Sequence, residues 1–202
     1  MTWHDSLKIT GGLLALLMYV PLIRDAVRTR GAGQSFAMWG LWAVLDSTIT
    51  ISLIAQRGNF WLTLGFAAGS IALSILLLCQ GRFAWGRVET VILGLVLICL
   101  GVWKFSGPKV ATVATTAAIF IAGWPGLMAL WRDPQPAVAR IWAGYTLANL
   151  AAFCGGSAWS IEERFAPGVF AVQTLALVAV GYWRKPAPCP GTAPGGKSAP
   201  PL

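Results

Sequence analysis

Two short runs of aromatic and hydrogen-bonding residues have the spacing of a ligand-binding face. Trp39, Trp42 and Asp46 stand at positions i, i+3 and i+7, so they project from one side of a helix. The same kinds of residue recur 103 positions later, at the same spacing, as Trp142, Tyr145 and Asn149. Aromatic faces stack on sugar rings or planar heterocycles, and Asp and Asn side chains hydrogen-bond hydroxyl or amide groups. The pattern predicts two facing ladders that bind a small polar solute.

The repetition extends to residues outside these two runs. An offset of 103 relates Ser70 to Gln173, which we expect to add polar groups to the same site. An offset of 104 relates Pro21 to Pro125, and Arg28 precedes Arg132 by the same number. Two copies of one design therefore make up most of the chain. In an apolar protein, this is typical of a transporter whose ligand site lies between two structural halves.

The composition places the chain in a membrane. Of 202 residues, 56% are hydrophobic and only 11% are charged, which is too much apolar surface for one small soluble domain to bury. The net charge of +8 does not indicate nucleic-acid binding, because the apolar runs are not joined by basic clusters with interleaved aromatic residues.

Seven apolar stretches approach the length of about 20 residues that a helix needs to cross a bilayer. We expect them at about 9–27, 36–56, 60–79, 88–105, 110–131, 138–156 and 166–183. The predicted fold is an all-α membrane protein with seven transmembrane helices in a 3+1+3 arrangement. A first triple-helix repeat (1–80) and a second one (108–185) are joined by a linker helix (81–107), and a disordered tail follows (186–202).

The basic residues predict an orientation. Ten Lys and Arg residues fall on one side of this arrangement and five on the other, and the richer side is expected to be cytoplasmic. The amino terminus is then outside and the carboxyl terminus inside. The first span is expected to be a retained helix and not a signal peptide. Lys8 is the only Lys or Arg that precedes it, and no small-residue cleavage site follows.

The polar residues inside the spans have structural interpretations as well as functional ones. An ionised carboxylate at the bilayer centre costs about 2.5 to 3.5 kcal/mol, so Asp46 must face protein or water. Trp39 and Trp142 lie near span ends, where tryptophan is also a common interfacial anchor. Pro21 and Pro125 can act as hinges or only as packing kinks. A lone polar side chain can simply bond a neighbouring helix.

Enzymatic chemistry and metal binding are not expected. His4 is the only histidine and lies near the amino terminus, so the chain offers no Ser-His or Cys-His pair and no histidine cluster. The cysteines have no metal-binding spacing. Glu162 and Glu163 are expected in a solvated loop. We expect no cofactor.

The architecture resembles the PQ-loop proteins, including the SWEET and SemiSWEET sugar transporters. Each half has a proline late in its first span, a basic loop, a Trp-bearing second span and a short third span. The Pro-Gln signature of that family is replaced by Pro21-Leu22 and Pro125-Gly126. The resemblance implies a site with facing aromatics and a pair of amides, a role open to Asn149 and Gln173, whereas Asp46 and Ser70 depart from it.

A second resemblance concerns the solute. The run Trp39-x-x-Trp42-x-x-x-Asp46 is similar to the Trp-x-x-Trp-x-x-x-Asn element of the Pnu vitamin transporters. Those proteins share the seven-span plan and move nicotinamide riboside or related vitamins, which implies that the aromatic residues stack on a heterocycle.

The leading hypothesis is a facilitator of the bacterial inner membrane that moves a small polar solute, such as a sugar or a vitamin- or nucleoside-like compound, by alternating access. In one variant, Asp46 carries a proton and couples transport to a proton gradient. The alternative is a non-transporting receptor or scaffold with the SWEET fold. The expected partners are the solute and the lipid bilayer, not nucleic acid. Assembly into a homo-oligomer is compatible with the sequence.

Overall fold

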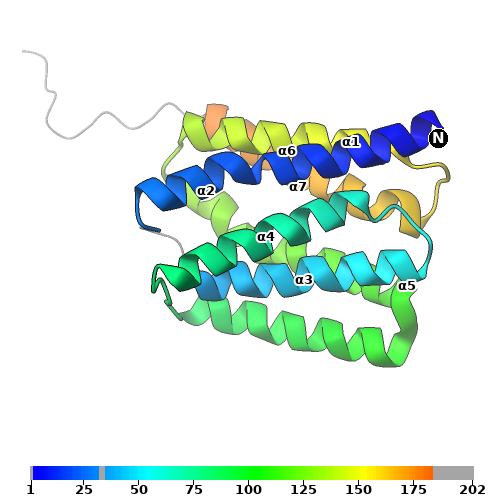
Figure 1. The fold of residues 1–202 in the computed structure, drawn as a ribbon, viewed down its shortest axis with the longest axis horizontal. Coiled ribbons are helices and arrows are strands. Elements are labelled where there is room, and N and C mark those ends of the chain that lie inside the picture. Colours follow the sequence, from blue (N-terminus) through cyan, green and yellow to red (C-terminus); the bar gives the residue numbers. More distant parts are fainter. Residues whose placement is uncertain (1, 32–34, 184–202) are drawn as a thin grey trace, which may run out of the picture.

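The computed structural model describes residues 2–31 and 35–183, and all regular structure in these ranges is helical. In chain order the elements are α1 (Trp3–Leu17), α2 (Tyr19–Arg28), α3 (Phe36–Ala55), α4 (Trp61–Cys79), α5 (Arg87–Arg132), α6 (Pro136–Gly155), a short π-helical turn η1 (Ile161–Phe165) and α7 (Ala166–Trp183) (Figure 1). The tail expected at 186–202 lies outside the described residues.

The first expected span is divided at Met18, between α1 and α2. Pro21 has no amide hydrogen to donate to the carbonyl of Leu17, and it is tolerated because it lies in the first turn of α2. At the other end, Thr2 and Asp5 form a reciprocal capping box that fixes the start of α1.

Helix α5 contains a reversal of direction at Gly107. This residue has φ of 81°, a left-handed conformation that glycine adopts without a steric penalty, and Pro108 follows it. The ribbon turns back at this point, so a first segment of α5 (87–106) and a second segment (108–132) run antiparallel (Figure 1). The sequence prediction of a break between 105 and 110 agrees with this turn.

Five helical stretches in the described part of the chain are long and apolar enough to cross a membrane. They are Trp3–Arg28, Phe36–Ala55, Trp61–Cys79, Arg87–Arg132 and Ile161–Tyr182. Helix α6 is not among them, although it has 20 residues, because polar and charged residues such as Arg140 and Asn149 interrupt its apolar run. The prediction of an all-helical membrane protein is confirmed at this level.

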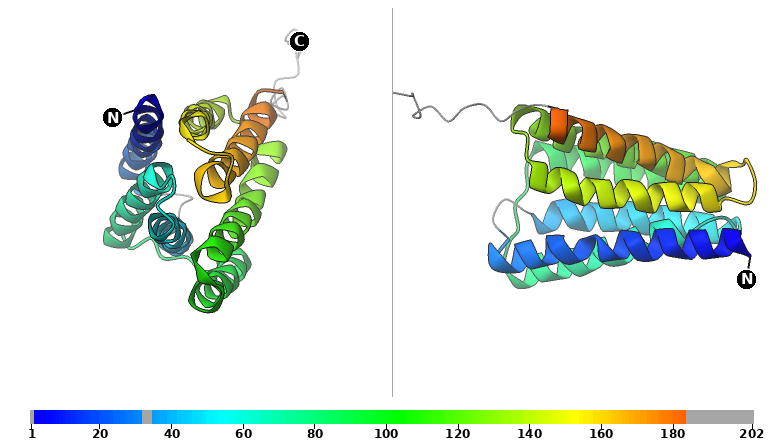
Figure 2. Two further views of the ribbon diagram at one scale, coloured as in Figure 1. Left: turned by 90° about the vertical axis from the view of Figure 1, so that its right-hand side faces the viewer. Right: turned by 90° about the horizontal axis from the view of Figure 1, so that it is seen from above.

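The helices pack in two groups that meet along their length (Figure 2). We call α1 to α4 the first bundle, in which α1 and α3 both pack against α4. We call the second segment of α5, with α6 and α7, the second bundle, in which α7 packs against both other helices. Between the groups, α1 packs along α6, and Gln56 at the end of α3 reaches Thr112 in the second segment of α5.

Small residues allow the close approach of α1 to its two neighbours. A Cβ atom at Gly11 would meet the backbone of Ala148 and Ala152 in α6, and one at Gly12 would meet the carbonyl group of Trp61 in α4. A Cβ atom at Gly65 would in turn meet the carbonyl oxygen of Gly12. The backbones of α1 and α4 therefore touch, as in other membrane helix pairs with glycine at the crossing.

This crossing gives a first prediction. Gly65→Ala should destabilise the protein by about 1–3 kcal/mol, because its methyl group meets backbone that cannot move aside. The melting temperature in detergent should fall by about 2–4 °C for each kcal/mol. Gly94→Ala is the matched control, since a Cβ atom there meets nothing within 4 Å. An equal loss in both variants would contradict the close crossing.

Candidate functional site

Asp46 is buried in the middle of α3, with 2% of its surface exposed. Its Oδ2 atom lies 3.1 Å from the hydroxyl of Ser70 in α4. That hydroxyl is also 2.8 Å from the carbonyl oxygen of Phe66. Because a hydroxyl has one proton to donate, the bond to the Asp46 carboxylate competes with the bond to the backbone. Sequence reasoning had grouped Asp46 with Ser70, and the structure brings these two residues together.

Asn149 has the corresponding place in α6 and is fully buried. Its Nδ2 atom donates to the hydroxyl of Thr174 at 3.3 Å, and this hydroxyl donates to the carbonyl oxygen of Phe170 at 2.8 Å. Its Oδ1 atom is buried and has no hydrogen-bond partner within the described part of the chain. An unfilled acceptor of this kind leaves a place for a ligand or a water molecule.

The two polar pairs are separated by nearly the same sequence offset. Asp46 maps to Asn149 at 103 residues, but the residue that bonds Asn149 is Thr174, which follows Ser70 by 104. Gln173, the residue expected there, instead donates to the carbonyl oxygen of Phe120 in α5 at 3.2 Å. The offset of 104 that relates the two prolines was the signal that could have found Thr174.

Aromatic rings connect the two bundles beside these polar pairs. The ring of Tyr19 in the first bundle meets that of Tyr145 in the second edge-to-face, with centroids 5.8 Å apart. Tyr19 also contacts Trp39, at 6.0 Å between centroids, and Tyr145 contacts Trp142 and Phe66. Sequence reasoning predicted Trp39, Trp142 and Tyr145 but missed Tyr19, which precedes Pro21 and belongs to no repeated run.

Two further features of the aromatic residues bear on binding. The indole Nε1 of Trp39 is buried without a hydrogen-bond partner among the residues that the structure covers. The hydroxyl of Tyr19 interacts with those of Ser70 and Tyr145, so the ring cluster and the polar pair of the first bundle are continuous. Trp42 packs instead against the larger apolar core, to which helices of both bundles contribute.

A bulky residue and a glycine have exchanged places between the bundles. In the first bundle, the ring of Tyr19 on α2 covers Gly69 on α4. In the second bundle, 104 residues later, the glycine is Gly123 on α5 and the covering side chain is Gln173 on α7. The side chain over the glycine therefore comes from the earlier helix in the first bundle and from the later helix in the second.

The end of the structure that holds the amino terminus is joined across the bundles by polar contacts. Lys8 Nζ lies 2.7 Å from Glu163 Oε2 in a pair that is about nine-tenths buried. Asn59 donates its side-chain amide to the carbonyl of Ala152 at 2.9 Å, and Gln56 donates to the hydroxyl of Thr112 at 2.8 Å. The expectation that Glu163 is solvated is wrong, because η1 turns its side chain inward toward Lys8.

The prolines proposed as hinges have different surroundings. Pro21 stands directly after the break between α1 and α2. Pro125 lies inside the second segment of α5, which stays helical on both sides of it. Its ring leaves the carbonyl of Ile121 without its usual helical donor. Whether either residue acts as a hinge stays a prediction.

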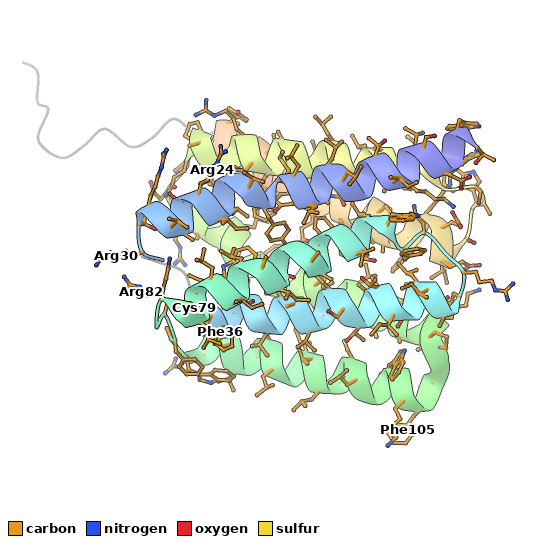
Figure 3. All side chains as sticks on the ribbon, in the orientation of Figure 1. Arg24, Arg30, Phe36, Cys79, Arg82 and Phe105 are labelled. Carbon is orange, nitrogen blue, oxygen red and sulfur yellow. The ribbon has the colours of Figure 1, made fainter. Side chains whose placement is uncertain are left out.

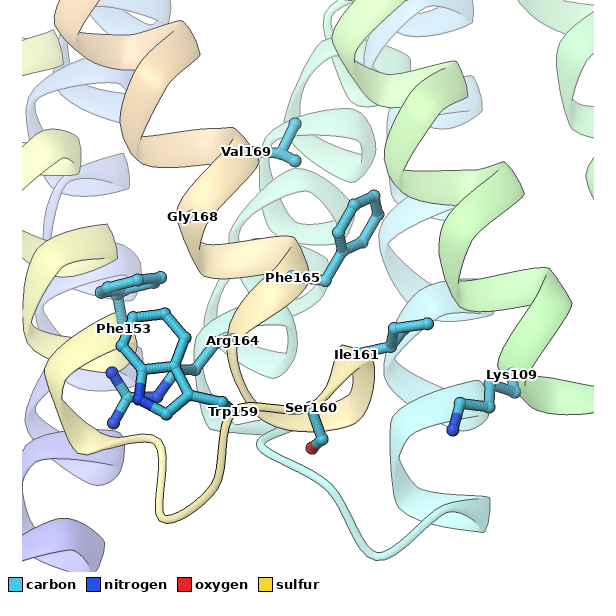
Figure 4. A pocket seen from close by; sticks show the side chains of 9 residues that line it. All are labelled: Lys109, Phe153, Trp159, Ser160, Ile161, Arg164, Phe165, Gly168 and Val169. Carbon is cyan, nitrogen blue, oxygen red and sulfur yellow. The ribbon is translucent and has the colours of Figure 1, made fainter.

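Two pockets open at opposite ends of the molecule. One of about 660 Å³ lies near the amino-terminal end, and Figure 4 shows the residues that line it: Lys109, Phe153, Trp159, Ser160, Ile161, Arg164, Phe165, Gly168 and Val169. Within it, Arg164 lies over the ring of Trp159 at 4.4 Å. The other, of about 480 Å³, lies where Arg30 and Arg82 project together at the opposite end (Figure 3). Sequence reasoning predicted neither.

Among the described residues, no group of three or more His, Cys, Asp or Glu side chains is placed to hold a metal ion. Comparison of the chain with protein-family models, with curated proteins and with solved structures gives no match. What is established is the class, an all-helical membrane protein with several helices long and apolar enough to span a bilayer.

The pairing of Asn149 with Thr174 gives a second prediction. In a double-mutant cycle, Asn149→Leu and Thr174→Val should show a coupling energy of about 0.6 kcal/mol, the usual size for a hydrogen bond between membrane helices. Asn149→Leu and Gln173→Leu form the matched cycle and should be additive, because Gln173 bonds α5 instead. Unfolding in detergent measures both. Coupling to Gln173 but not to Thr174 would contradict the assigned pairing.

Proposed function

We propose that this chain is a membrane transporter, a facilitator that moves a small polar solute by rocking the first bundle against the second. In this proposal the first segment of α5 is the linker of a 3+1+3 arrangement, and the reversal at Gly107 makes it a span of its own. The matching contacts of α4 and α7 with their neighbours support two repeats of one bundle.

The observation that carries the proposal is a pair of buried polar residues, one in each bundle, beside the contact of Tyr19 with Tyr145. Asp46 and Asn149 occupy equivalent positions, and Tyr19 and Tyr145 connect their surroundings across the interface. Ionisable groups at membrane depth are expensive, and they usually mark a solute or ion pathway. A protein that only had to pack its helices would be more stable with apolar residues there.

The two ends of the interface suggest how such a site would open. At the amino-terminal end, the bundles are joined by the Lys8–Glu163 ion pair and by Asn59 and Gln56. Deeper in the interface, the contacts are aromatic, so opening toward the far end separates the rings of Tyr19 and Tyr145 without breaking an ion pair. We infer that this conformation is closed at the amino-terminal end, and that Pro21 and Pro125 are candidate hinges.

The proposed location is the inner membrane of a bacterium, with the amino terminus outside. The loops at the far end carry Arg30, Arg82 and Arg87, and both α2 and α5 finish there in an arginine, Arg28 and Arg132. A majority of positive charge at one end favours a cytoplasmic location for that end.

The proposal is tested by measuring solute uptake into liposomes that contain the purified full chain. A panel of labelled sugars, nucleosides, vitamins and amines should include at least one solute with saturable uptake that empty liposomes lack. Uptake that does not respond to an imposed pH gradient would reject proton coupling through Asp46. Absence of uptake for the whole panel would contradict the transporter assignment.

The closed end gives a third prediction. In a chain whose four natural cysteines are replaced by alanine, cysteines at Lys8 and Glu163 joined by a short bismaleimide should stop uptake, because the bundles can no longer separate. Ala26 and Gln80 form the control pair, since they touch within the first bundle. Loss of uptake in the cross-linked control variant, with uptake kept in the cross-linked variant of Lys8 and Glu163, would contradict this mechanism.

A second candidate function is a receptor that binds a ligand without moving it. The 660 Å³ pocket favours it, because the pocket combines exposed Trp159 with the cationic side chains of Lys109 and Arg164. Ligand binding that is lost in Arg164→Ala, together with no uptake of that ligand, would support this second function.

A further inference from the structure

The carboxyl group of Asp46 has no basic partner. Within the described residues the ion pairs are Lys8–Glu163 and Lys109–Glu162, and no Lys, Arg or His nitrogen lies within 4 Å of Asp46. The ionisable groups that interact with it are the phenols of Tyr19 and Tyr145, which are neutral or negative. A buried carboxylate is stable only when something cancels its charge. A proton can do this, and so can a cation supplied by a ligand.

The surroundings of Asp46 favour a cation with an organic body. The rings of Tyr19, Tyr145 and Trp39 form one connected cluster next to it. Aromatic faces carry negative electrostatic potential and attract ammonium groups, most strongly where water is excluded. A bare metal ion would gain little from such rings, because it needs several oxygen ligands.

The hydrogen-bond inventory leads to the same class of ligand. Asn149 Oδ1 is an unfilled acceptor in the covered part of the chain, and the Asp46 carboxylate shares its one donor, Ser70, with a backbone carbonyl. The unfilled donor in the cluster is the Nε1 group of Trp39. A ligand that satisfies all of these groups brings a positive charge and a hydrogen-bond donor, with at most a small acceptor.

From these observations, we propose that the site between the bundles selects a small organic cation, an amine or nitrogen heterocycle that also bears a hydrogen-bond donor. This inference rests on the proposed transport function and narrows its solute. The positive end of the ligand faces Asp46 of the first bundle, and its donor faces Asn149 of the second. Since the second bundle has an amide where the first has an acid, the site holds one positive charge.

The test uses pairs of probes that differ in charge and little else. Choline is compared with dimethylbutanol, its uncharged carbon analogue, and benzylamine with benzyl alcohol. Binding to the purified full chain is measured by titration calorimetry, and uptake is measured in liposomes. At least one cation should bind more than tenfold tighter than its neutral analogue. Asp46→Asn should remove this preference and leave the affinity for the neutral analogue unchanged.

Asp25→Asn is the matched control, because it removes a carboxylate from the exposed face of α2 and should keep the preference. If Asp46→Asn does not fold, the comparison of charged and neutral probes in the unaltered protein still decides. Equal affinity within both pairs, together with saturable uptake of a neutral sugar, would overturn the cation assignment and leave the transporter standing. No binding or uptake of any probe or solute would overturn both.

Discussion

Burial of polar side chains inside an apolar helical protein is the constraint on which the rest of this structure depends. Asp46 and Asn149 cannot face lipid tails without a large cost in solvation free energy. The faces of α3 and α6 that carry them must therefore point into the protein. Each then bonds a hydroxyl on the next helix, Ser70 or Thr174. These bonds fix the rotation of α3 against α4 and of α6 against α7. The facing of the two bundles follows from this rotation, because Trp39, Tyr145 and Trp142, one or two turns away, are carried to the same ring cluster.

Much of the fold could be predicted from the sequence, because apolar length and loop composition are local signals. The predicted spans agree with the helices to within a few residues at most ends, including the turn at Gly107, which divides α5. The division at Met18 was not predicted, since no glycine or charge marks it and the effect of Pro21 appears one turn upstream. The prediction that the two halves are repeats concerns how the helices of each half pack in space. A constant offset in sequence can only suggest such packing.

The candidate site could be predicted in part. Asp46 and Asn149 were found because polar residues are rare in apolar helices, and Ser70 followed from the repeat. Thr174 was missed through a shift of one residue in α7, and Tyr19 because a single tyrosine carries no spacing pattern. The burial of Glu163 depends on Lys8, which is more than 150 residues away, and no local rule relates two such charges. Contacts between distant elements were the information that the sequence lacked.

The exchange of Tyr19 over Gly69 for Gln173 over Gly123 makes the two bundles mechanically unequal. The Tyr19 ring lies on Gly69 and its hydroxyl lies beside Ser70 and Tyr145, so a shift of α2 against α4 also moves a side chain that contacts the second bundle. The amide of Gln173 is tied to the carbonyl of Phe120, a directional bond that resists the same shift of α5 against α7. The two bundles therefore differ in what an internal shift of their helices would disturb. Movement inside the first bundle reaches the partner bundle through Tyr19, whereas movement inside the second first has to break the bond of Gln173 to Phe120.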